Sequence, residues 1–261
     1  MSKGREAINK VAVAKKEKDT SEYKILVPAL DQAIKILLYL QDAAGVKMSL
    51  TNICKAIGLH KSKGHSILKT LQRYDIVARD SDSKAYTLGA RLIPLARAVL
   101  DHLDFRSAAA PIVEELAKET GMTVWFGLAM NKSLFVVSKH EAGEHFWATP
   151  GIGQSFRLYE GAHGKAAIAY LPAAERDAIL SKVENKNAIV RELDSVKRHG
   201  FARDAGEFAK GINAVAAPVF GPGQQVLGVL LLFGTFPKAQ MDKLGNKTAI
   251  AAKRISQKLG N

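Results

Sequence analysis

The sequence predicts an α+β protein of two domains. Between residues 25 and 90, three amphipathic helical segments precede two short β-segments around a polar turn. From residue 110 onward, apolar strand-like runs alternate with helical patterns over about 150 residues. A chain of 261 residues, 47% of them apolar, is long enough for two cores. We therefore divide it into an arm (1–24), a helical domain with a hairpin (25–90), a connecting helix (91–109) and a larger domain (110–261).

The composition narrows the class of protein. Lys and Arg total 38 against 25 acidic residues, a net charge of +13 that attracts phosphate polymers or anionic surfaces. The single cysteine, Cys54, excludes an internal disulfide and a cysteine-cluster zinc site. No apolar run reaches the roughly 18 residues of a membrane helix, and residues 1–24 lack the apolar stretch of a signal peptide. We expect a cytoplasmic protein without a membrane partner, and we expect residues 1–24 to form a flexible basic arm.

The first helix of the 25–90 domain begins near Pro28, a residue that suits a first helical turn. Leu30, Ile34, Leu37 and Leu38 follow at helical spacing and predict the apolar face of this amphipathic helix. An apolar face of this kind ordinarily packs against a core.

Two further helices follow. Ser49 or Thr51 caps the second, and Gly58 ends it as a left-handed C-terminal residue. Its inward-facing residues are Leu50, Ile53, Cys54 and Ile57. The third helix is predicted over residues 61–77, with Ile67, Leu68 and Leu71 facing the core.

Strands at 76–79 and 85–88 follow the third helix, around a polar turn. This order of helices, turn and hairpin is that of a winged helix-turn-helix domain. Between Lys47 and Tyr74 there are six basic residues and no acidic residue. A surface that must not repel phosphate has this pattern, although a solvated basic face without a partner also has it.

The third helix of such a domain lies in the major groove of DNA, with residues near its N-terminus at base edges. Lysines there bind phosphate or guanine, and Ser and His suit base edges. The predicted DNA contacts on the helix and the hairpin are Lys61, Ser62, Lys63, His65, Ser66, Lys69, Arg73, Arg79 and Lys84. The alternative is that all nine are ordinary solvent-exposed side chains that contact no DNA.

The rest of the chain predicts a connecting helix with Pro94 in its first turn and a further helix that begins at Pro111. The larger domain then alternates elements, which we predict as strands at 123–128 and 134–137, helices at 164–171, 172–183 and 187–200, strands at 215–220 and 226–233, and a terminal helix at 241–259.

An enzyme is the first alternative to weigh. His163, His199, Asp204 and Glu207 include the imidazole and carboxylate of an acid–base pair, but they are far apart in sequence. No nucleophile elbow, phosphate loop or metal-ligand spacing accompanies them. The histidines and glutamates of the loop at 140–145 are more simply solvated. We expect no catalytic site, no metal and no cofactor.

The order of these motifs resembles the IclR family of bacterial transcriptional regulators, roughly from Leu26 to Lys258. The matching stretches are VPALDQAIKILLYL, LTNICKAIGLHKSKGHSILKTL, YTLGARLIPLA, HGKAAIAYLP, RHGFARDAGEFAKGINAVAAPVF and VLGVLLLFG. The resemblance implies a winged helix-turn-helix, a linker helix and a GAF/PAS-like effector domain, assembled as a homodimer or homotetramer. Ser66 stands where many relatives have arginine, which weakens any transfer of operator preference.

The resemblance also implies a small-molecule pocket on one side of the effector-domain sheet. Ala162 and His163 match a loop whose backbone faces the effector, Asp204 matches a polar position, and Ala214 matches a site often occupied by cysteine. Leu231 and Phe233 match positions that are serines in members that sense small oxo-acids. Beyond the resemblance, we expect three aromatic residues to extend this apolar lining: Trp125, Phe146 and Trp147. An aromatic or otherwise hydrophobic organic acid fits this wall better than glyoxylate, unless these apolar residues are plain core.

We therefore expect a ligand-responsive, sequence-specific regulator, a repressor of a catabolic or metabolic operon, with double-stranded operator DNA and a small organic acid as partners. One alternative is a GAF-like metabolite-binding protein or an enzyme with an incidental basic N-terminal domain. Another is a nucleoid or RNA-binding protein without a ligand.

Overall fold

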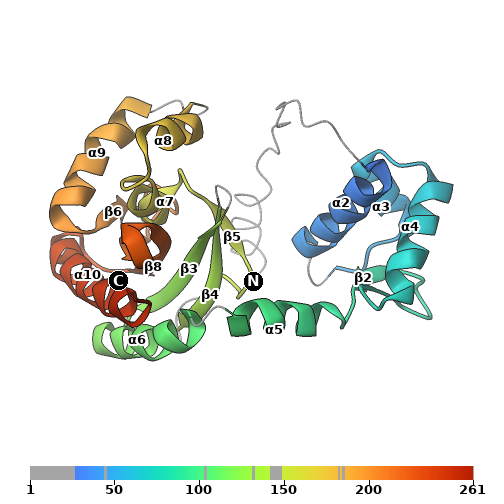
Figure 1. Ribbon diagram of the computed structural model, residues 1–261, viewed down its shortest axis with the longest axis horizontal. Helices are drawn as coiled ribbons and strands as arrows, with labels where there is room; N and C mark the ends of the chain where they lie inside the picture. The colour runs from blue at the N-terminus through green and yellow to red at the C-terminus, as the bar shows by residue number, and fades with distance from the viewer. Residues whose placement is uncertain are drawn as a thin grey trace. The chain divides into compact units, whose positions relative to one another are not determined.

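The computed structural model describes residues 27–43, 46–102, 105–130, 133–141, 149–181, 183 and 186–260 (Figure 1). The predicted arm lies outside the described residues. The contacts divide the chain into two compact units, with the division between residues 103 and 104.

The smaller unit is a winged helix-turn-helix, as the sequence predicts. Its elements in chain order are α2 (Pro28–Asp42), α3 (Leu50–Ile57), α4 (Lys61–Arg73), β1 (Val77–Arg79), β2 (Tyr86–Leu88) and α5 (Leu92–His102). The strands β1 and β2 pair antiparallel, and Met48 forms a bridge to Tyr86 beside them. Six buried side chains from these elements make the core: Ile36, Leu40, Ile53, Leu68, Val77 and Tyr86.

The ends of α3 form as the sequence predicts. Of the two candidate caps, Ser49 is the one used, because its Oγ accepts the N–H of Asn52 at 3.2 Å. Gly58 follows α3 with φ +73°, the left-handed conformation expected of it.

The end of α4 differs from the prediction, which carried this helix to residue 77. The helix ends at Arg73 because Asp75 adopts φ +56° and the N–H of Ile76 bonds to the carbonyl of Leu71 at 3.0 Å. That pair of features is a Schellman motif with aspartate where glycine is usual. No glycine therefore marked the stop in the sequence.

The apolar face predicted for α2 is also largely wrong. The core side chains of this helix are Ile36 and Leu40, whereas Leu30, Ile34 and Leu38 are 59%, 48% and 49% exposed. The helix carries apolar residues on two faces, and helical spacing alone did not show which face meets the rest of the unit.

The larger unit is built on one six-stranded antiparallel sheet, in the order β5-β4-β3-β8-β7-β6. The strands are β3 (Thr123–Met130), β4 (Ser133–His140), β5 (Ser155–Arg157), β6 (Ala202–Ala205), β7 (Asn213–Phe220) and β8 (Val226–Gly234). Short 3-10 turns occupy Pro222–Gln224 and Lys238–Gln240. The short strands β5 and β6 were not predicted.

Helices cover both faces of this sheet (Figure 1). On one face lie α6 (Phe105–Thr120) and α10 (Met241–Lys258). On the other lies α7 (Gly161–Ile168), followed in the chain by α8 (Ala173–Leu180) and α9 (Lys186–His199). The helix predicted at 164–171 corresponds to α7, which begins and ends three residues earlier. Burial follows this layering, since the side chains of α7 are buried along nearly the whole helix.

The prediction that Pro111 begins a helix is wrong, because α6 runs through this residue. Pro111 lies on the exposed side of α6, where a missing backbone N–H costs less than inside a core. The connecting helix predicted at 91–109 corresponds to α5 and the first residues of α6. Residues 103 and 104 lie outside the described residues.

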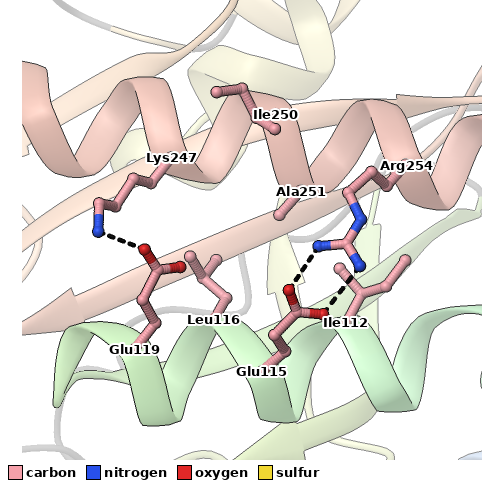
Figure 2. Close-up of a pocket in the computed structure, with 8 residues that line it drawn as sticks. All are labelled: Ile112, Glu115, Leu116, Glu119, Lys247, Ile250, Ala251 and Arg254. Atoms are coloured by element: carbon pink, nitrogen blue, oxygen red, sulfur yellow. Dashed lines mark hydrogen bonds and ion pairs between the residues drawn. The ribbon is translucent and has the colours of Figure 1, made fainter.

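Figure 2 shows the groove between α6 and α10, on the sheet face opposite α7. Arg254 holds both carboxylate oxygens of Glu115 at 2.8 Å, and Lys247 bonds to Glu119. The floor beneath these pairs is apolar: Ile112, Leu116 and Ala251. We interpret this groove as a packed seam between two helices.

Candidate DNA interface and effector site

Helix α4 presents its predicted contact residues to solvent and buries only Gly64 and Leu68. The exposed residues are Lys61, Ser62, Lys63, His65, Ser66, Lys69 and Arg73. A Cβ on Gly64 would lie 2.3 Å from the Sγ of Cys54, so α3 and α4 approach each other as closely as glycine allows. The sequence pattern had not paired these two residues.

The charges of α4 have no internal partners in the described part of the chain. There, no ion pair joins an acidic side chain to Lys61, Lys63, Lys69 or Arg73. His60 precedes the helix without a side-chain cap. Helix amides and lysine ammonium groups therefore face the same end, an arrangement that favours a phosphate.

The two serines of α4, unlike its lysines, are joined by a hydrogen bond within the helix. Ser66 donates its hydroxyl proton to the carbonyl of Ser62 at 3.1 Å, inside the helix. In this conformation Ser66 offers an outside partner its acceptor oxygen only.

The wing carries the other two predicted DNA contacts, and both have internal partners. Arg79 donates to the carbonyl of Lys84 at 3.3 Å, with its guanidinium 5.4 Å from the centre of the Tyr86 ring. Lys84 adopts φ +55° and donates to the carbonyl of Ser81 at 2.6 Å. Both side chains are exposed, so phosphate contact requires them to add or exchange partners.

Asp80 organises the turn between the wing strands, a role that the sequence pattern did not reveal. Its carboxylate bonds to Lys47 at 2.8 Å and accepts the N–H and the hydroxyl of Ser83 at 2.8 and 2.7 Å. These partners, Lys47 first, hold the pKa of Asp80 well below its usual range. Lys47, one of the six basic residues between Lys47 and Tyr74, is therefore paired with a carboxylate and is less available to an outside anion.

In the larger unit, strand register gathers the predicted effector residues. Asp204 pairs with Ala214 and Ala214 with Phe233, while Leu231 pairs with Trp125 in the next row. Residues two apart on a strand share a face, so the two rows lie side by side. The first turn of α7 adds the remaining two, Ala162 and His163. All seven are buried, and the other two aromatic residues expected in the lining, Phe146 and Trp147, lie outside the described residues.

Four rings meet at this place, and two of them were absent from the prediction. Trp125 stacks on Phe156 at 5.7 Å, and His163 meets Phe156 at 5.2 Å and Phe208 at 5.5 Å between ring centres. Phe208 in turn contacts Phe156 edge-on at 6.0 Å. Phe156 lies on the unpredicted strand β5, and Phe208 lies in the loop between β6 and β7, where no periodicity marks an inward side chain.

His163 is neutral in this setting. The residue is 3% exposed, and burial lowers the pKa of its imidazole to about 3. Its Nε2 is buried and has no hydrogen-bond partner among the described residues. Buried polar atoms are nearly always paired, so this nitrogen indicates a missing partner.

Charged groups next to the rings fix the loop that carries Phe208. Asp204, whose pKa burial raises, accepts the N–H groups of Glu207 at 2.7 Å and Phe208 at 3.2 Å. Lys165, 4% exposed, bonds to Glu192 and Glu207 at 2.6 Å each. Burial opposes its charge, but the two carboxylates prevail and raise the pKa of Lys165.

The residues weighed for catalysis do not form a catalytic set. A histidine with a pKa near 3 is a poor base at neutral pH, and His199 bonds instead to the carbonyl of Ser195 at 2.8 Å. Within the described ranges no three metal-ligating side chains gather, and Glu144 and His145 lie outside them.

None of the described helices has the length and apolar character needed to span a membrane.

Comparison with known proteins matches both units to one family. Residues 29–81 match the IclR helix-turn-helix domain, and residues 97–257 match the C-terminal domain of the bacterial transcriptional regulator IclR. The regulator XynR of Escherichia coli is 28% identical over 217 residues, 79% of this chain and 86% of that protein.

Two further relatives agree. The repressor AllR of Klebsiella pneumoniae is 24% identical over 245 residues, 89% of this chain and 90% of that protein. An IclR regulator from Alicyclobacillus acidocaldarius has a crystal structure that superposes with a TM-score of 0.79 at 27% identity, covering 90% of this chain and 99% of that one. The predicted resemblance and fold class are therefore confirmed, and the chain belongs to the IclR family of transcriptional regulators, ligand-responsive DNA-binding proteins rather than enzymes.

Proposed function

We propose that this regulator represses a catabolic or metabolic operon in the cytoplasm and is controlled by a small organic acid, an aromatic one fitting best. The proposal that the protein binds DNA rests on one observation. Helix α4 exposes a row of basic side chains that have no acidic partners in the described ranges, next to a helix N-terminus without a side-chain cap. The repressor role rests on similarity to AllR, whose name states that activity.

The nine predicted DNA contacts divide by chemistry. Lys61 and Lys63, with the α4 amides, bind phosphate or guanine at the first turn, and Lys69 and Arg73 extend this charge along the helix. The shorter side chains meet base edges: Ser62, His65 and Ser66. Arg79 and Lys84 of the wing contact the flanking backbone or the minor groove.

The effector part rests on the first turn of α7. The amides of Ala162 and His163 suit a carboxylate, since helix N-termini attract anions. The unpaired Nε2 of His163 offers a hydrogen bond to a hydroxyl or other polar group, and Leu231, Phe233 and Trp125 supply an apolar wall. Because His163 stays neutral, it binds the ligand by hydrogen bonding and not as a cation.

A second copy of the chain fits the exposed side of α2. Leu30, Ile34 and Leu38 form an apolar stripe at helical spacing, and Ile93 and Leu95 of α5 are 71% and 52% exposed. Exposed apolar groups of this size mark interaction surfaces. A symmetric homodimer, alone or paired into a homotetramer, reads two half-sites at helical-turn spacing.

The effector acts by population shift in this proposal. It binds one arrangement of the paired effector domains better than another, and the helix at 91–109 changes the spacing of the two winged domains. No contact to DNA needs to change for the affinity to fall, because a half-site displaced along the groove is no longer in register.

Two experiments test the proposal. Fragments of the host genome enriched by binding to the protein are compared with shuffled duplexes by fluorescence anisotropy, and the proposal expects a clear sequence preference. A thermal-shift screen of aromatic and small carboxylic acids then tests the effector class. Stabilisation by small oxo-acids alone would contradict the apolar wall, and no preference among duplexes would contradict operator binding.

A further inference from the structure

We infer that Phe208 occupies the effector's ring position in the ligand-free chain, so that it sets the size of ligand the site admits. This inference rests on the proposed effector site at the start of α7. It adds a residue that neither the sequence pattern nor the strand register had placed there.

The ring distances show that the place is filled. The Phe208 centre lies 5.5 Å from that of His163 and 6.0 Å from that of Phe156, both edge-on. Aromatic pairs in contact have centres about 4.5–7 Å apart, so no further ring fits between these partners. The same cluster holds the buried Nε2 of His163 that has no partner among the described residues. The unpaired Nε2 and the Phe208 ring beside it are what we expect of a ligand site that a side chain of the protein fills when no ligand is bound.

Of the four rings, Phe208 is the one able to leave. Trp125, Phe156 and His163 are fixed on β3, β5 and α7, whereas Phe208 is half-buried in the loop between β6 and β7. Gly206 and Gly211 bracket this loop, both at φ +85°, a conformation that glycine adopts without strain. They provide pivots on either side of Phe208.

Polar contacts from Asp204 and Lys165 hold the loop in its closed position. Asp204 accepts the amides of Glu207 and Phe208, and the Glu207 carboxylate bonds to Lys165. When a ring-bearing acid replaces Phe208, Glu207 moves with its neighbour. The displacement therefore reaches Lys165, whose ammonium also bonds to Glu192 on α9.

The ligand class follows from what is displaced. A benzoate-sized acid replaces one benzene ring with another and places its carboxylate at the α7 amides. A two- or three-carbon oxo-acid has no ring to restore the contacts with Phe156 and His163. Phe208 thus favours single-ring acids over both smaller and bulkier ones.

The test is isothermal titration of benzoate into the full chain and two alanine variants. Phe208→Ala removes the competing ring, so benzoate is expected to bind about tenfold tighter than to the wild type. Phe156→Ala is the matched control from the same cluster. It removes a wall of the site, so benzoate affinity is expected to fall about tenfold or more.

These opposite signs separate a built site from a simple cavity, because a cavity made by truncation would admit benzoate in both variants. Phenol serves as the uncharged probe, and Phe208→Ala is expected to prefer benzoate over it. Equal or weaker benzoate binding to Phe208→Ala, or no benzoate binding at all, would overturn the inference. Phe208→Leu repeats the test with a smaller change if the alanine variant unfolds.

Failure of the proposed function gives a different result. If Phe208→Ala binds benzoate tightly while neither acid nor variant alters duplex binding, the closed site is real and its control of DNA binding is refuted. If the wild type prefers its enriched duplex and responds to another acid, operator binding stands and only the role of Phe208 is refuted.

Discussion

The lysines of α4 and Lys165 of α7 show two opposite uses of one side chain. Lys61 and Lys63 are exposed and meet no acidic partner in the described ranges, whereas Lys165 is 4% exposed and bonds to two glutamates. An unpaired surface charge contributes little to folding and remains available to an outside anion. A buried, paired charge has no capacity left for a ligand, but the fold depends on its partners. Charge counts alone did not distinguish these two cases.

The largest effect is expected where the charge is buried. Lys165→Met removes the cation between Glu192 and Glu207 and leaves their carboxylates facing each other, at about half exposure. We expect a loss of about 2–3 kcal/mol in the free energy of unfolding, less than for a fully buried pair because water reaches the glutamates. Urea denaturation of the effector unit in the full chain measures it. Lys247→Met, which breaks the surface pair with Glu119, is the control and should cost below about 1 kcal/mol.

The exposed lysines should behave in the opposite way. Replacing Lys61 and Lys63 together by alanine is expected to leave the melting temperature unchanged and to weaken duplex binding roughly 10- to 30-fold. The slope of log affinity against log salt should fall by about 2, one for each phosphate that the variant no longer binds. Lys118→Ala, which removes an exposed lysine of α6, is the control. An unaltered salt dependence in the double variant would remove α4 from the interface.

A third variant tests how α4 is presented. Gly64→Ala places a methyl group against the Cys54 Sγ, and we expect a loss of about 1–2 kcal/mol because neither helix can move freely. Cys54→Ala is the compensating change, since it removes the clashing sulfur. The double variant should recover most of the loss in a double-mutant cycle. Strict additivity would mean that the helices already separate enough to accept a side chain.

The smallest effect is expected at Asp80, whose carboxylate pairs with Lys47, the lysine that precedes α3. Asp80→Asn releases Lys47 and should slightly tighten duplex binding while it weakens the wing. Because the pKa of Asp80 is lowered in the folded chain, its stabilisation is present above the unfolded value of about 4 and is lost as the pH falls further. The stability difference between wild type and variant should therefore be visible at pH 7 and shrink below about pH 4. A difference that stays constant as the pH falls from about 5 to 2 would show that the carboxylate charge is not its cause.

The elements predicted correctly are those with a strong local signal. Ser49 and Gly58 bound α3 as expected, and the strands β7 and β8 were recognisable as long apolar runs. The misses have weak local signals. The strand β6 is four residues long and includes Arg203 and Asp204, and the left-handed residue that follows α4 is Asp75 rather than a glycine.

The effector-side residues show the limits of single-sequence reasoning most clearly. Family resemblance supplied Asp204, Ala214, Leu231 and Phe233, and strand register then placed them in adjacent rows. Phe208 lies in a loop without periodicity, and its inward position depends on hydrogen bonds from its own backbone to Asp204. Such an interaction has no sequence signature. In the same way, spacing did not show that Leu30 and Ile34 face away from the core.

Our main proposal is that the exposed basic side chains of α4, which have no acidic partners in the described ranges, read a specific DNA sequence. Its most direct test is the dissociation constant for an enriched genomic duplex against a base-shuffled duplex of equal length, at about 150 mM salt. We expect the enriched duplex to bind at least about 1000-fold more tightly, as for specific regulators, and we expect shuffling only the base pairs under α4 to abolish this tight binding. Equal affinity for the two duplexes would contradict the proposal.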